Sequence, residues 1–205
     1  MSWQLYFVDC EEKGLSVIKI PILRGILWVL LMGTASGRMS ANDKGYPVMG
    51  SEEIMSPKAH GTCAAPVQDN LRYGCDFKTA DSICCYNRHY AEHSGYWTSK
   101  TTFLDDVDRS GVTTFYDSVS GKPLFKAPIG RTFDEFVKES RAHGWPSFRD
   151  EEVVWENVRC LSDGEAVSVD GTHLGHNLPD SKGNRYCINL VSCSGNPVGP
   201  RKSDL

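Results

Sequence analysis

The feature that most constrains the fold of this chain is a stretch of regular alternation near its carboxyl end, residues 185–192 (RYCINLVS). Apolar residues alternate there with others at period two, which predicts a β-strand. The face toward the core would carry Tyr186, Ile188 and Leu190. The opposite face would carry Arg185, Cys187 and Asn189. This strand would therefore present a thiol between a permanent cation and a neutral amide.

Polar groups are dense in the seventeen residues from His173 to Asn189. We expect His173 and His176 to lie in a loop before the strand, where either imidazole could act as a general acid near neutral pH. A thiolate is a nucleophile, a neighbouring arginine favours the ionised form of a cysteine, and Asn189 can donate to an oxyanion. A structural cysteine explains Cys187 taken alone, but the whole cluster favours a catalytic site.

These residues belong to a longer series of motifs, GWPSF at 144–148, THLGH at 172–176 and RYCIN at 185–189. They are accompanied by SGKPLF at 120–125 and by Val158–Arg159. In this order and spacing the motifs resemble the methionine-R-sulfoxide reductases of the B class, over residues 90–193.

The resemblance implies a mechanism and a role for each residue. Cys187 would attack the sulfur of methionine sulfoxide, free or in proteins, and become a sulfenic acid. His176, or else His173, would protonate the departing oxygen. Asp180 would orient the loop or one imidazole, and Arg185 would keep Cys187 ionised.

Trp145 lies in a Gly-Trp-Pro turn. The resemblance implies that it forms an apolar wall for the substrate methyl group. The residues alone favour this no more than a loop tryptophan that covers the core.

The sulfenic acid must be cleared by a second thiol, whose disulfide a thioredoxin-like dithiol would reopen. Some members of the family carry that thiol just before GWPSF, but His143 stands there. Cys160 is our first candidate, on the assumption that it lies on a neighbouring strand, followed by Cys85 and Cys84. Cys193 would lie ~20 Å from Cys187 along an extended strand, too far for a disulfide.

Zinc-carrying members of the family hold a C-x2-C pair where this chain has Asp117 and Ser120, and only Cys160 stands near the place of the second pair. We therefore expect no zinc at that site and no cofactor.

Residues 61–98 contain half of the cysteines, Cys63, Cys75, Cys84 and Cys85. Their spacing lacks the C-x2-C pairs of structural zinc sites, so it favours disulfides. Adjacent Cys84 and Cys85 would seek separate partners. The polar and aromatic residues from His89 to Trp97 could line a pocket, but we favour an edge that packs on the sheet.

The amino-terminal residues 1–45 indicate targeting. Basic residues precede an apolar run at 26–32, and small residues follow it, as in a cleaved secretory signal. A signal anchor, an organelle presequence and a wrongly assigned start are the alternatives, so we expect the secretory pathway or an organelle. The further division would be a linker at 46–60, an extension at 61–98, the reductase domain at 99–196 and a flexible tail at 197–205.

The remaining patterns predict a mainly β fold of small antiparallel sheets curled together, with one or two short helices, as the resemblance also implies. Strands are expected at 112–116, 124–125, 152–160 and 165–169. A helix should begin at Thr132, because Glu135 completes a capping box, and should end at Gly144 and Pro146.

The net charge is −4 without a basic patch, so we expect no nucleic-acid partner, and we expect a monomer. Two other functions stay open. One is a non-catalytic, disulfide-stapled secreted domain. The other is a hydrolase that uses Cys187, His176 and Asp180.

Overall fold

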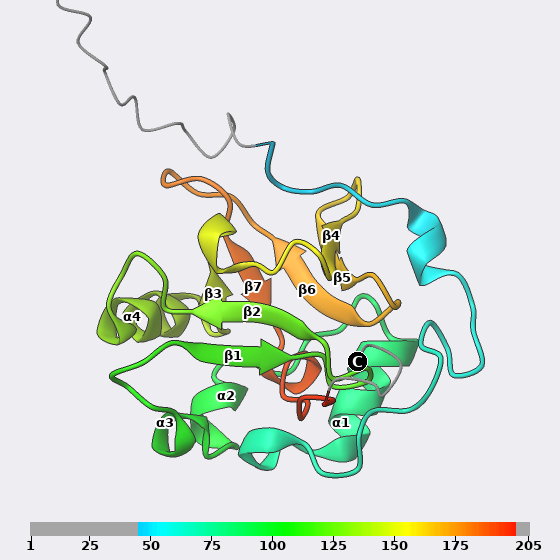
Figure 1. Cartoon of the computed structure of the whole chain (residues 1–205), viewed down its shortest axis with the longest axis horizontal. Coiled ribbons are helices and arrows are strands. Elements are labelled where there is room, and N and C mark those ends of the chain that lie inside the picture. The colour runs from blue at the N-terminus through cyan, green and yellow to red at the C-terminus, as the bar shows by residue number, and fades with distance from the viewer. Residues whose placement is uncertain (1–44, 200–205) are drawn as a thin grey trace, which may run out of the picture. The chain divides into compact units, whose positions relative to one another are not determined.

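The structure, a computed structural model, describes residues 45–199 (Figure 1). The expected targeting segment lies outside the described residues except for Gly45, as does the tail beyond Gly199. Within the described part of the chain, no helix is long and apolar enough to cross a membrane.

Two antiparallel sheets form the fold. The smaller pairs β1 (Thr113–Tyr116) with β2 (Pro123–Ala127). The larger has the order β3-β7-β6-β5-β4. Its strands are β3 (Ser147–Phe148), β4 (Val158–Cys160), β5 (Glu165–Ser168), β6 (His173–Asn177) and β7 (Tyr186–Ile188). These short antiparallel strands confirm the mainly β class.

Four α-helices are present in residues 45–199, where one or two were expected: α1 (Phe77–Asp81), α2 (Tyr96–Ser99), α3 (Phe103–Asp106) and α4 (Phe133–His143). The first three span at most five residues, too few for a periodic pattern to show. Helix α4 has the expected capping box between Thr132 and Glu135, and it ends at Gly144, whose φ is 91°.

Short turns of 3₁₀-helix complete the elements, at Glu52–Met55, Arg72–Gly74, Asp150–Glu152 and Leu190–Ser192. A π-helical turn, Ser82–Tyr86, follows α1 directly. The strand expected at 152–160 is correspondingly shorter, because residues 150–152 form a 3₁₀ turn, Val153 makes only an isolated bridge to Phe125, and β4 begins at Val158.

Four phenylalanines join the two sheets and α4. Phe148 of β3 stacks on Phe125 of β2 at 4.3 Å between ring centroids. It also meets Phe115 of β1 at 5.0 Å and Phe136 of α4 at 5.5 Å. All four side chains are buried, and each contributes roughly 1.5–3 kcal/mol of hydrophobic free energy. This cluster fixes β3, the strand beside β7.

The strand predicted over 185–192 has the expected facing but is shorter. Tyr186 and Ile188 are fully buried, while Cys187 is partly exposed on the other face. Pairing ends at Ile188, and the chain then turns into the 3₁₀ turn Leu190–Ser192. The ~20 Å separation expected for Cys193 assumed extended chain, so it does not apply; Cys193 is buried in the core.

The segment expected as a linker, 46–60, packs along the edge strand β4. Gly50 N donates to Cys160 O at 2.8 Å, and Cys160 N donates to Val48 O at 2.9 Å. Tyr46 stacks on Trp155 at 5.1 Å between ring centroids. The following residues, 61–98, share one hydrophobic core with the two sheets through side chains such as Trp97. These segments are therefore part of the folded unit that holds the sheets.

Candidate functional site

The two histidines lie on strand β6 rather than in a loop, which corrects the expectation. In a regular strand residues three apart point to opposite faces. The pairing of β6 with β5 shifts between Ala166 and Val167, which leaves Leu174 as an extra residue on β6. This β-bulge returns His173 to the face of His176, and their ring centroids lie 5.6 Å apart.

Gly175 permits the close pairing of β6 with β7 at this point. Its φ is 154°, and a Cβ at this position would lie 2.1 Å from Cys187 O. Only glycine lets the two backbones approach this closely.

A pocket of about 240 Å³ opens on this face of the sheet. It is lined by five of the residues singled out from the sequence, Cys187, His173, His176, Asn189 and Trp145. His89, Tyr90 and Leu178 lie in the same lining. Sequence reasoning favoured a sheet edge for the whole run from His89 to Trp97. Its start lines the pocket, while its end, Tyr96 and Trp97, is buried in the core.

Cys187 has a polar neighbour across each adjoining strand. It pairs with His176 of β6 and with Ser147 of β3. Ser147 Oγ lies 3.8 Å from Cys187 Sγ. Arg185 directs an Nη1–H at the same sulfur, so the expected cation beside the thiol is present.

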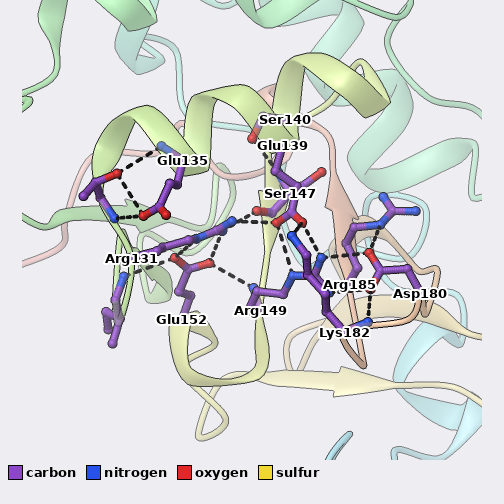
Figure 2. Close-up of polar contacts among 12 residues, drawn as sticks. Arg131, Glu135, Glu139, Ser140, Ser147, Arg149, Glu152, Asp180, Lys182 and Arg185 are labelled. Atoms are coloured by element: carbon purple, nitrogen blue, oxygen red, sulfur yellow. Dashed lines mark hydrogen bonds and ion pairs between the residues drawn. The ribbon is translucent and has the colours of Figure 1, made fainter.

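The Arg185 guanidinium forms an ion pair with the carboxylate of Asp180 (Figure 2). Its Nε lies 3.4 Å from Asp180 Oδ2, close enough for an ion pair but not aligned for a hydrogen bond. Asp180 accepts bidentate hydrogen bonds from Arg149 at 2.8 and 3.0 Å, and these hold the pKa of its carboxyl well below the ordinary value.

Asp180 acts on the loop between β6 and β7. It accepts from Lys182 N at 2.8 Å and exchanges backbone hydrogen bonds with Gly183. Of the two roles expected for it, orienting the loop fits these contacts, while the imidazole is oriented by another residue.

That residue is Glu165, at the start of β5, which sequence reasoning missed. Its carboxylate lies 2.6 Å from His173 Nδ1, and both side chains are buried. Hydrogen bonds from His173 and Arg88 hold the pKa of Glu165 below its ordinary value against the opposing effect of burial. Because Nδ1 faces this ionised carboxylate, Nε2 is the ring nitrogen of His173 left for the pocket.

His176 has a different environment on the same strand. Burial, and then the neighbouring His173, lower its pKa from the ordinary value. At neutral pH the His176 ring is therefore uncharged for most of the time.

Glu92 anchors both Asn189 and Trp145, and sequence reasoning missed it as well. Its backbone N donates to Asn189 Oδ1 at 3.1 Å, and its backbone O accepts from Trp145 Nε1 at 2.9 Å. Its carboxylate accepts from Leu190 N at 2.9 Å and from Val191 N at 3.1 Å. Burial raises the pKa of Glu92 to about 7.

None of the three expected resolving cysteines lines the pocket with Cys187. Cys160 is on β4, three strands from β7, or about 14 Å at the usual strand spacing. It also lies on the core face, in the row of Ala166, Gly175 and Ile188. The assumption of a neighbouring strand was wrong because β5 and β6 both lie between β4 and β7, and residues 172–176 were expected to form a loop rather than β6.

The other two candidates have other environments. Cys85 forms a disulfide with Cys63, which confirms that adjacent Cys84 and Cys85 do not pair with each other. Cys84 is a free thiol without exposed surface, 3.5 Å from Ser192 Oγ. Burial raises its pKa well above the ordinary value.

Asp117 and Ser120, where the sequence analysis expected no zinc, lie in one turn. Asp117 is buried, accepts from Val119 N at 2.8 Å and Ser120 N at 3.3 Å, and accepts from Thr172 Oγ1 at 3.0 Å. The Asp117 carboxylate oxygens are thus hydrogen-bonded to donors of the protein itself.

No family model matches this sequence, and no curated protein matches it. The chemistry of the pocket therefore has to be derived from its own residues: a thiol beside a cation, two imidazoles with different partners, an amide and an apolar wall.

Proposed function

We propose that this chain reduces methionine R-sulfoxide to methionine with Cys187 as the nucleophile. The observation that carries the proposal is the shared lining of one small pocket by Cys187, His173, His176 and Trp145. Such a set matches a substrate with a polarised S=O bond and an apolar methyl group. The R epimer is proposed on the motif resemblance.

In the first step the Cys187 sulfur attacks the sulfoxide sulfur while an imidazole delivers a proton to the oxygen. The oxygen then passes to Cys187, so the products are methionine and a Cys187 sulfenic acid. The cysteine sulfur is oxidised by two electrons, and the substrate sulfur is reduced by two.

The two histidines have separate roles. His176 is the cross-strand partner of Cys187 and, being mostly neutral, can take the thiol proton and return it to the sulfoxide oxygen. His173, fixed by Glu165, has its Nε2 on the pocket side of the ring and positions the imidazole beside the bound sulfoxide.

The sulfenic acid is recycled by an external dithiol rather than by an internal cysteine. The first thiol of the dithiol displaces water to form a mixed disulfide, and the second releases Cys187 and leaves a disulfide in the reductant. In the described part of the chain, Cys187 is the one cysteine in the pocket lining. The other four free thiols in residues 45–199, Cys75, Cys84, Cys160 and Cys193, are buried.

The exposed residues that line the pocket favour a substrate in which methionine sulfoxide is part of a polypeptide, rather than the free amino acid. Tyr90 and Leu178 line the pocket and are 64% and 48% exposed. Among residues 45–199, the pocket lining contains no carboxylate and no lysine or arginine that could bind the ammonium and carboxylate of a free amino acid.

The test is reduction of a mixed-epimer methionine sulfoxide peptide with dithiothreitol. We expect wild type to consume the R epimer alone, Cys187→Ser to be inactive, and Cys75→Ser, which alters a buried thiol outside the pocket, to retain activity. Folded wild type that leaves both epimers intact contradicts the proposal. Ester or amide cleavage that needs no dithiol would favour the hydrolase alternative.

A further inference from the structure

A second group of reactive side chains lies apart from the pocket lining. His60, Asp81 and Cys85 each offer a metal-ligating atom, and these atoms all lie within 4.8 Å of one another. Cys63 joins the group through its disulfide to Cys85. The sequence spacing of the cysteines argued against a metal site, because it took no account of the histidine and the aspartate.

A tight turn sets two members of the group. His60 and Cys63 exchange backbone hydrogen bonds, each of 2.9 Å, around Gly61 and Thr62. Gly61 has φ +61°, and a Cβ there would lie 2.0 Å from Cys85 O. This glycine therefore lets the turn lie directly against the backbone that carries Cys85.

The helical segment opposite sets the other two. Asp81 ends α1 and Cys85 lies in the π-helical turn that follows it. Residues four apart on a helical segment share a face, so both face the turn. Asp81 is already within 2.8 Å of His60 Nε2.

His60 is oriented by another group, as metal-ligating histidines are. Its Nδ1 lies 3.0 Å from Tyr86 Oη, so Nε2 is directed at Asp81. The side chains of His60 and Asp81 are 24% and 18% exposed, which leaves a path for an ion.

We propose that reduction of the Cys63–Cys85 disulfide turns this group into a zinc site. Two thiolates, an imidazole and a carboxylate are ligands that Zn²⁺ takes in four-coordinate sites. In the oxidised chain the sulfurs are bonded to each other and the group cannot bind the ion. The chain thus has one crosslink between the 60–63 turn and the 81–85 segment in each redox state.

The exchange balances with an external dithiol as the reductant. A dithiol reduces the disulfide to two thiols and is itself oxidised to a disulfide. Zinc binding then releases the two thiol protons to solvent. This inference does not depend on the proposed reductase activity.

The test measures zinc retained by the full chain in the Cys187→Ser background, which removes the pocket thiol as a competing ligand. Protein is either left oxidised or reduced with a phosphine, loaded with zinc sulfate, desalted and analysed for metal. Affinity is measured by competition with a chromophoric chelator. The ligand variants are His60→Gln and Asp81→Asn, and His93→Gln, an exposed histidine of the same region, is the matched control.

We expect one zinc ion per reduced chain and none per oxidised chain. His60→Gln and Asp81→Asn should weaken binding, and Tyr86→Phe should weaken it about tenfold or more, while His93→Gln should not change it. Reduced, folded protein without zinc would overturn the proposal, and so would His60→Gln with unchanged affinity. If reduction unfolds the chain, refolding on addition of zinc supports the site and failure to refold rejects it.

Discussion

Cys187 and His176 are direct partners across the antiparallel pair of β7 and β6. Directly opposed residues have Cβ atoms about 4.5–5.5 Å apart. The proposed nucleophile and its proton acceptor are therefore set by the sheet register and not by a loop. A substitution that alters this register should therefore lower the rate of the chemical step more than it weakens substrate binding.

The first prediction concerns Glu165, which holds His173 through a 2.6 Å contact. Glu165→Gln replaces an ionised carboxylate by an amide, so the ring loses its charged partner and Arg88 keeps only its ion pair with Glu52. We expect kcat for sulfoxide reduction to fall roughly ten- to hundred-fold with little change in KM.

Glu53→Gln is the matched control, because Glu53 is exposed. It should keep the wild-type rate. A Glu165→Gln enzyme with normal kcat would show that His173 needs no fixed orientation.

The sequence was enough to predict which side chains of β7 face the core and which residues could be reactive. It was not enough to predict which strands pair with each other. Alternation alone placed Tyr186 and Ile188 inward and Cys187 outward, as found. Glu165 was missed because residues 172–176 were interpreted as a loop. With no strand there, nothing indicated that β5 would bring a carboxylate to His173. A β-bulge places two residues of one strand opposite one residue of its partner. It interrupts the alternation of apolar and polar residues, so no periodic pattern in the sequence indicates it.

Long-range contacts were beyond reach for the same reason. The roles of Glu92 and Arg149 depend on chain segments about 97 and 31 residues away, and no local pattern encodes such distances. The strand that ends at Ile188 illustrates a competing tertiary effect. The Glu92 carboxylate binds the free amides of Leu190 and Val191 and stabilises a turn where alternation predicted extended chain.

The second prediction tests the close approach of β6 and β7 at Gly175. In Gly175→Ala the new Cβ would meet Cys187 O at 2.1 Å, which is backbone and cannot move aside alone. We expect a loss of more than 1 kcal/mol in the free energy of unfolding, measured by urea denaturation, and loss of turnover. Gly199→Ala, in open space, should match wild type; equal stability of the two variants would contradict the strand geometry.

The third prediction follows from the pKa of Glu92, raised by burial to about 7. A group whose pKa is higher in the folded state stabilises the protein below its unfolded pKa, and that stabilisation is lost as pH rises through the folded value. Wild type should therefore lose stability between about pH 5 and about pH 8.5, by roughly 2 kcal/mol from this group.

Glu92→Gln keeps an acceptor for one of the two amides and cannot ionise. Its free energy of unfolding should fall by roughly 2 kcal/mol less than that of wild type over the same pH range. Urea denaturation at each pH measures the difference. Parallel curves for the two proteins would mean that Glu92 has the same proton affinity folded and unfolded.

The last prediction separates external from internal recycling of the Cys187 sulfenic acid. Cys160 lies on the opposite face of the sheet, about 14 Å away by strand spacing, well beyond the roughly 7 Å limit for a disulfide. Cys160→Ala should therefore keep dithiothreitol-dependent turnover within about twofold of wild type, after correction for the folded fraction. Mass spectrometry of wild type treated with sulfoxide and no reductant should find Cys187 as a sulfenic acid, and a Cys187–Cys160 crosslinked peptide would show that the sheet opens during the cycle.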